Sequence, residues 1–123
     1  MWEKEMWIAK RKKVETNDMG VEIEYFYPPI RYLINYQPVS DQMSFLEYGE
    51  HIVDVYRAFL TSMAYQGKIK VGDRAYLSDG QTSPSELKAL VESDDEFCNK
   101  ANYVVKIVLP QNFFTRVDFL KRR

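Results

Sequence analysis

The feature that most constrains the fold lies in the last quarter of the chain, where two apolar runs flank a short turn. Residues 101–109 and 113–121 are rich in β-branched and aromatic side chains, and the turn-forming tripeptide 110–112 separates them. This pattern predicts a β-hairpin. Because side chains alternate along a strand, one face of the first strand is expected to carry Tyr103, Val105, Ile107 and Leu109. The second strand is expected to place Val117 and Phe119 on one face, and Arg116 and Asp118 on the other. Such a hairpin needs upstream strands to pair with, so it is interpreted as scaffold rather than as a site.

The length and composition limit the chain to one ordinary domain. With 123 residues, we expect a single domain over residues 1–123 that holds a modest core. Aromatic residues make up 15% of the chain and include nine tyrosines, which favours β-structure and is also common at protein interfaces. The net charge of -1 argues against a surface that binds nucleic acid in general. The single cysteine, Cys98, excludes an internal disulfide and fits a reducing compartment.

Targeting and membrane signals are not expected. The start of the chain lacks the basic flank and apolar core of a signal peptide. No apolar run approaches the ~20 residues that a membrane-spanning helix needs. We therefore expect a soluble protein, made inside the cell, with no membrane partner.

A second hairpin is predicted near the amino terminus, from a strand over 5–14, a polar loop over 15–20 and a strand over 21–25. In its second strand the apolar Val21, Ile23 and Tyr25 alternate with Glu22 and Glu24. If Val14 lies opposite Val21, then Lys13 faces Glu22 and Arg11 faces Glu24 on one exposed face. Each such pair contributes about 0.2–1 kcal/mol.

The basic run of this hairpin has two interpretations. It consists of Lys10, Arg11, Lys12 and Lys13. The favoured interpretation is a solvated strand face paired with glutamates, and the alternative is a patch that binds phosphate and faces DNA.

The middle of the chain is predicted to supply one strand, one apolar loop and one segment whose pattern fits either a helix or a strand. Prolines on both sides bound a strand with Ile30, Tyr32, Ile34 and Tyr36 on one face. The loop 39–49 has no helix or strand period, yet it carries Met43, Phe45, Leu46 and Tyr48. These four side chains either cover an open end of the core or bind a partner. Residues 51–60 fit an amphipathic helix and a buried strand equally well.

A turn, a strand and a helix are expected between residues 68 and 96. Gly72 begins a turn that leads into a short strand ending at Leu77. A short surface helix is predicted over about 84–92, with Ser83 as N-cap and Pro84 at the first helical position. Leu87, Leu90 and Val91 give this helix a small apolar stripe. The acidic run 94–96 is an unfavourable end, because carboxylates repel a helix carboxyl terminus.

Neither a catalytic nor a metal-binding constellation is visible in the sequence. The only histidine, His51, lies far from Cys98 in the chain, and a zinc site needs more such ligands than these two. The acidic run 94–96 lacks the spacing and glycine of a calcium loop, so we interpret it as a solvated turn. The five glycines are scattered singly and form no phosphate-binding loop. We therefore expect no enzyme activity, no cofactor and no metal.

Six short segments, in this order, carry a family resemblance. They are residues 5–11 (EMWIAKR), 35–40 (NYQPVS), 46–50 (LEYGE), 54–58 (DVYRA), 71–77 (VGDRAYL) and 101–105 (ANYVV). The series resembles small head–tail connector proteins, of the head-closure or stopper type, from tailed bacteriophages and prophages of Gram-positive gut bacteria. The resemblance covers nearly the whole chain, but residues 78–100 form a longer, acidic insertion than the family pattern leads us to expect.

The resemblance implies a mainly β fold, specifically a small antiparallel β-barrel with long loops, in which 51–60 is a strand. It implies a structural protein of the virion neck, made in the bacterial cytoplasm, that assembles as a ring and joins the head to the tail. Its implied partners are copies of itself and the portal, adaptor and tail proteins of the same phage, with no sequence-specific nucleic acid.

Two other functions stay open from the sequence. One is another phage assembly part, such as a tail-completion or minor capsid protein. The other is a small nucleic-acid-binding β-barrel that uses the basic run 10–13. If the chain is a neck ring subunit or another phage assembly part, the candidate assembly surface is Met43, Phe45, Leu46 and Tyr48.

Overall fold

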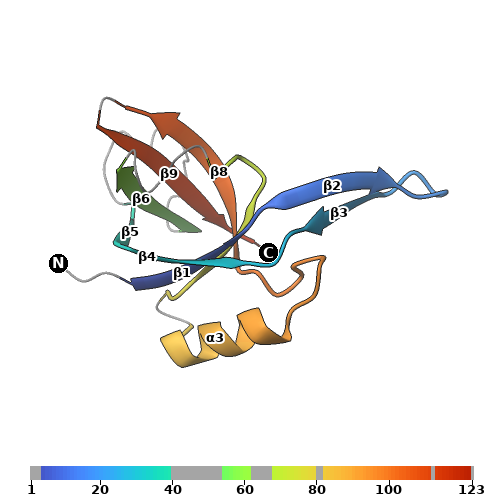
Figure 1. The fold of residues 1–123 in the computed structure, drawn as a ribbon, viewed down its shortest axis with the longest axis horizontal. Helices are drawn as coiled ribbons and strands as arrows, with labels where there is room; N and C mark the ends of the chain where they lie inside the picture. Colours follow the sequence, from blue (N-terminus) through green and yellow to red (C-terminus); the bar gives the residue numbers. More distant parts are fainter. Residues whose placement is uncertain (1–3, 40–53, 62–67, 80–81, 112, 123) are drawn as a thin grey trace.

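The computed structural model describes residues 4–39, 54–61, 68–79, 82–111 and 113–122, and these fold into a mainly β structure with one helix (Figure 1). This confirms the predicted fold class. The strands are β1 (Lys4–Ala9), β2 (Arg11–Thr16), β3 (Glu22–Phe26), β4 (Ile30–Ile34), β5 (Tyr36–Pro38), β6 (Val55–Thr61), β7 (Arg74–Leu77), β8 (Tyr103–Pro110) and β9 (Phe114–Lys121). The helix is α3 (Pro84–Ser93). Seven strands form one antiparallel sheet in the order β4-β1-β7-β8-β9-β6-β5, while β2 and β3 pair only with each other.

The large sheet rolls up without closing into a barrel, so the prediction of a closed β-barrel is wrong. Its two edges, β4 and β5, are consecutive in the chain and are joined through Asn35. One segment, 30–38, therefore supplies both edges, and a strand cannot form a ladder with its own continuation. We call the gap between the two edges, β4 and β5, the seam, and a side chain bridges it. The hydroxyl of Tyr36 on β5 donates to the carbonyl of Glu5 on β1 (3.0 Å) and accepts from the amide of Ser78 (2.7 Å).

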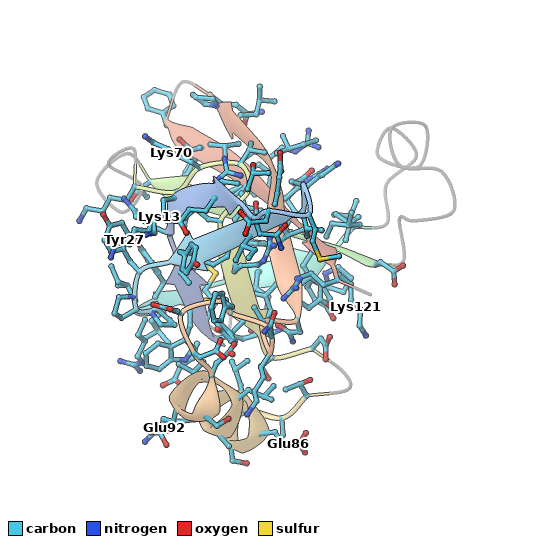
Figure 2. The ribbon with its side chains drawn as sticks, turned by 90° about the vertical axis from the view of Figure 1, so that its right-hand side faces the viewer. Lys13, Tyr27, Lys70, Glu86, Glu92 and Lys121 are labelled. Carbon is cyan, nitrogen blue, oxygen red and sulfur yellow. The ribbon has the colours of Figure 1, made fainter. Side chains whose placement is uncertain are left out.

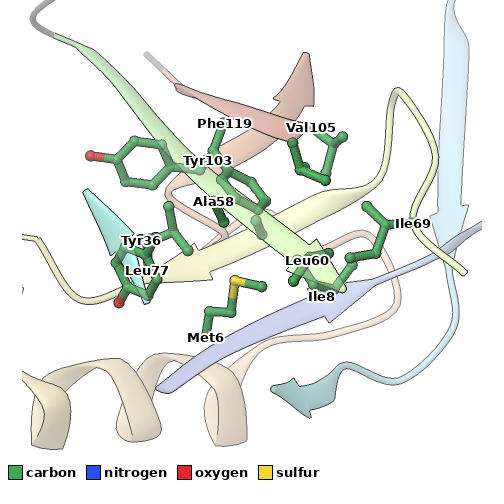
Figure 3. Close-up of a cluster of buried hydrophobic side chains, with 12 residues drawn as sticks. Met6, Ile8, Tyr36, Ala58, Leu60, Ile69, Leu77, Tyr103, Val105 and Phe119 are labelled. Atoms are coloured by element: carbon green, nitrogen blue, oxygen red, sulfur yellow. The ribbon is translucent and has the colours of Figure 1, made fainter. Parts of the chain in front are cut away.

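The rolled sheet encloses the main hydrophobic core (Figure 3). The core takes side chains from strands at both ends of the sheet order, and it consists of Met6, Ile8, Tyr36, Ala58, Leu60, Ile69, Ala75, Leu77, Tyr103, Val105, Val117 and Phe119. Two tyrosines bring polar groups into it. Burial raises the pKa of Tyr36 to about 12. The hydroxyl of Tyr103 donates to Asp79 (2.8 Å).

The hairpin predicted at the carboxyl end is confirmed as β8 and β9, with a difference in its second half. A β-bulge between Val105 and Ile107 gives β8 one extra residue. Beyond the bulge the alternation is reversed, so that Val108 rather than Ile107 packs against the core. Leu109, which was predicted to share the core face of Tyr103, is 44% exposed. Val117 and Phe119 of the return strand are buried in the core as predicted.

Other strands are confirmed with shorter or broken boundaries. The expected strand 5–14 is interrupted at Lys10 and becomes β1 and β2, which belong to different sheets. The segment 51–60, which fitted two structures, is a strand within the described residues, where β6 runs from Val55 to Thr61. It pairs with β9 over its whole length and contributes Ala58 and Leu60 to the core.

The predicted helix is confirmed as α3, and the segment that contains it covers a second core cluster. The hydroxyl of Ser83 accepts from the amide of Glu86, as expected of an N-cap (3.3 Å), and Pro84 occupies the first turn. At the carboxyl end, the ammonium of Lys100 donates to the carbonyl of Ser93 (3.1 Å), so a base from outside the helix offsets its acidic end. Leu87 is fully buried. The second cluster consists of Ala9, Phe26, Tyr76, Leu87, Cys98 and Ala101.

Candidate interaction surfaces

The β2–β3 hairpin stands away from the rest of the molecule as an arm (Figure 1). Every residue of β2 is exposed, and neither core cluster of the described residues takes a side chain from 11–25. The turn is built around Asn17, whose side-chain oxygen accepts from the amides of Met19 (2.9 Å) and Val21 (3.0 Å). Two-stranded hairpins of this kind are at best marginally stable alone in water, so the arm depends on contacts elsewhere.

The outer half of the arm, residues 14–23, combines exposed apolar side chains with acids. Val14 is 43% exposed, Met19 in the turn is 87% exposed, and Val21 is 55% exposed. The charged residues of this half are Glu15, Asp18 and Glu22, with no lysine or arginine. An exposed apolar set rimmed by charges is typical of a surface that binds another protein.

The base of the arm is fixed to the body by β7 and by the segment 94–101. The Phe26 side chain is buried in the second core cluster, and its amide donates to the carbonyl of Glu96 (2.8 Å). The guanidinium of Arg74 lies over the Phe26 ring (4.9 Å) and forms an ion pair with Glu24. The rings of Tyr25 and Phe97 are 5.2 Å apart. These contacts set the direction in which the arm leaves the sheet.

The acidic run that ends α3 is part of this base rather than only a solvated turn. Asp95 and Glu96 are exposed, as expected, but the carboxylate of Asp94 accepts from the Tyr76 hydroxyl (2.6 Å) and the Lys100 amide (2.9 Å). Burial, and then the hydrogen bond to Asp94, raise the pKa of Tyr76. Arg122 closes the segment from the other side, where it donates to the carbonyls of Cys98 and Ala101 (2.9 Å each).

The register of the arm corrects one of the two predicted charge pairs. Arg11 and Glu24 form an ion pair (3.2 Å) on one face, but not directly across from each other, because Arg11 lies opposite Phe26 and Glu24 lies opposite Val14 rather than Val14 opposite Val21. The pairing of Lys13 with Glu22 is wrong, because Lys13 lies opposite Tyr25 and Glu22 lies opposite Thr16, on the other face. The physical reason is the turn, which spans 17–21 rather than 15–20 and sets Thr16 opposite Glu22. The β-bulge between Arg11 and Lys13 then returns Arg11 to the face of Glu24.

The basic run at the base of the arm is divided between the two faces. Arg11 points to the side of Glu24, and its backbone amide donates to Asp73 (3.1 Å). Lys13 lies on the opposite face, where it pairs with Glu15 (2.8 Å) and sits over the Tyr25 ring (4.7 Å). The hydrogen bond and charge of Glu15 raise the pKa of Lys13. Lys12 lies over the ring of Tyr27 (5.7 Å), and Lys10 is half-buried. Arg11 and Lys13 each pair with a glutamate, on opposite faces of the arm, so the run does not form one continuous basic face.

A second surface lies on the outer face of β6, β9 and β8, and the sequence did not indicate it. Arg116 on β9 has Leu109 on one neighbouring strand and Phe59 on the other. Phe114 follows on the same face of β9, two residues along, and Phe113 lies beside it. Phe59, Leu109, Phe113 and Phe114 are 53%, 44%, 78% and 46% exposed. We call these four residues the three-strand patch. Two consecutive phenylalanines directly after the turn were the available sequence signal.

A buried ion cluster supports the three-strand patch. Asp118 is fully buried and lies between two arginines. Arg57, directly opposite on β6, contacts its carboxylate twice (2.7 and 3.1 Å), and Arg116 does the same (3.2 and 2.7 Å). The alternation in the sequence predicted an outward-facing Asp118, and the structure adds that two guanidinium groups cover it.

The remaining candidate sites do not form a chemical centre in the part of the chain that the structure describes. The predicted assembly residues Met43, Phe45, Leu46 and Tyr48 lie outside the described residues. A cavity of about 590 Å³ opens near the seam, between Leu33 of β4 and Pro38 of β5. Its carboxylate Asp79 already binds Tyr103 (2.8 Å). Among the described residues, no three His, Cys, Asp or Glu side chains cluster so that they could hold a metal.

Comparison with known proteins adds no identification. No family model, no curated protein and no solved structure matches this chain. Within the described ranges, no helix is both long and apolar enough to span a bilayer.

Proposed function

We propose that this protein is a structural assembly subunit that forms a ring, and that the ring joins the head of a tailed phage to its tail. The proposal combines the family resemblance of the sequence with the β2–β3 arm, and the arm is the observation that carries it. A ribbon that leaves the sheet, with apolar side chains at its tip, has no evident role in an isolated subunit. It gains one when a second molecule covers it. Its partners are copies of this chain and the portal, adaptor and tail proteins of the same phage.

The arm suits a contact that builds rings. A ring requires heterologous contacts, in which one part of each subunit binds a different part of the next. An arm that points away from the body reaches a neighbour without overlapping its own sheet (Figure 1). Burying one apolar side chain of this size stabilises a contact by about 1.5–3 kcal/mol, so Met19 and Val21 at the tip are a substantial contribution.

Shortening the arm is expected to abolish assembly while the subunit stays folded. The test variant joins Val14 to Glu24, which lie opposite each other, through an Asn-Gly turn in place of residues 15–23. Its melting temperature should stay close to that of the wild type, because both core clusters are untouched. Sedimentation should show that its association is lost.

The matched control replaces an exposed apolar residue outside the arm. Ile30 on β4 is 52% exposed, close to the exposure of Val21, so Ile30→Ser should leave association unchanged. Wild-type association of the arm-shortened protein would contradict the proposed role of the arm.

A further inference from the structure

The outer half of the arm and the three-strand patch differ in their surrounding charge. The outer half of the arm is acidic, with Glu15, Asp18 and Glu22. Two exposed lysines lie on or against β8, the strand that supplies Leu109 to the three-strand patch. Lys106 is the extra residue in the bulge of β8, three residues before Leu109. The turn that contains Lys70 is held against β8, because the Gly72 amide donates to the carbonyl of Val105 (3.0 Å).

These lysines are available to a partner. Lys70 and Lys106 are exposed and make no ion pair within the described residues. Figure 2 shows Lys70 near one end of the molecule and the acidic residues Glu86 and Glu92 of α3 at the other end. The charge of the body is therefore distributed unevenly, with unpaired lysines on the side of the three-strand patch.

We infer that the acidic outer half of the arm of one subunit docks on the three-strand patch of the next subunit. Apolar side chains then meet apolar side chains, and the carboxylates of the arm meet Lys70 and Lys106. The contact is heterologous, so a subunit uses its arm on one side and its patch on the other. This inference rests on the proposed function, because it names the surface that receives the arm.

The dimensions of the two surfaces agree. The arm is a ribbon of two strands, and three adjacent strands spaced about 4.8 Å apart offer a platform roughly 10 Å wide.

The other acidic surface, α3, is the weaker candidate for the same platform. None of the exposed large hydrophobic residues of the described chain lies on α3, so that contact would rely on surface charge pairs alone.

Mixing two defective variants tests the inference. The arm variant carries Met19→Ser and Val21→Ser, and the patch variant carries Phe113→Ser and Phe114→Ser. Each variant alone should associate at least about tenfold more weakly than the wild type. Mixed in equal amounts, they should form heterodimers, because the intact arm of the patch variant docks on the intact patch of the arm variant. The heterodimers should grow no further, because the arm and the patch that stay free are both defective. Sedimentation velocity and native mass spectrometry measure both results.

A charge exchange serves as the second test and does not alter packing. Glu22→Lys on the arm and Lys106→Glu in the bulge of β8 should each weaken association, and combining both changes in one chain should restore it. The control is Glu92→Lys on α3, which should have no effect.

The outcomes separate this inference from the proposed function. Wild-type association of the patch variant alone, or a mixture without heterodimers, would overturn the inference and leave the ring proposal standing. Wild-type association of the arm variant would contradict the role of the arm in both. A wild-type protein that stays monomeric throughout would contradict both.

Discussion

Asp118→Asn is expected to lower the free energy of unfolding by about 3–5 kcal/mol, because the change removes a buried negative charge that both Arg57 and Arg116 contact. The carboxylate is fully buried, and the side chains of the two arginines are only 14% and 16% exposed. Asparagine has nearly the same volume, so the loss reports charge and hydrogen bonding rather than a cavity. Equilibrium denaturation in urea measures it.

The exposed ion pair of the arm is the matched control. Glu15→Gln breaks the contact with Lys13, in which both side chains are about half exposed to water. The expected change in the free energy of unfolding is below about 0.5 kcal/mol. Equal effects of Asp118→Asn and Glu15→Gln would contradict the structural role assigned to the buried cluster.

Leu87→Ala is expected to destabilise the protein by about 2–5 kcal/mol and also to loosen the base of the arm. Leu87 is fully buried in the second core cluster, together with Phe26 at the base of the arm and Cys98 in the segment 94–101. A cavity at this position weakens the packing of both. Urea denaturation measures the loss of stability, and limited digestion with trypsin, which cuts after Lys12 and Lys13, measures the release of the arm.

Leu33→Ala on β4 is the control for this prediction. Leu33 is 51% exposed, so the same chemical change should cost less than about 1 kcal/mol and leave the rate of tryptic cleavage unchanged. If Leu87→Ala destabilises the protein without faster cleavage at the arm, then the second cluster stabilises the fold but does not hold the arm.

The elements that the sequence predicts well are those specified by neighbouring residues. The hairpin of β8 and β9 follows from two apolar runs around a turn, and the start of α3 follows from Ser83 and Pro84. The contact between Arg11 and Glu24 was also predicted within one local hairpin, although from a register that the structure does not have. In each case the partners are close in the chain, so one sequence contains the necessary information.

The features that the sequence does not predict depend on distant contacts or on one inserted residue. Each of the two β-bulges reverses the faces of a strand, so period-two alternation fails beyond Lys12 and Lys106. The exposed Leu109 is a direct result, whereas the mistaken pairing of Lys13 results from a turn that spans 17–21 instead of 15–20. Burial of Asp118 requires Arg57, which is 61 residues away.

The direction in which the arm leaves the sheet was also not predictable from the sequence. Its hairpin was predicted, but not its departure from the sheet. That departure depends on Arg74, Phe97 and Glu96, which come from the region beyond residue 70. The acidic segment 78–100 supplies two of these three residues, Glu96 and Phe97, and is therefore part of the arm's support.

The central claim is that this chain closes into a ring through its arm. The most direct test is the mass of the wild-type protein, measured by native mass spectrometry and sedimentation velocity over a wide range of concentration. The account predicts one discrete oligomer of constant mass, because a closed ring stops growing once its last contact forms. A monomer at every concentration, or a mass that keeps rising with concentration as in an open filament, would contradict it.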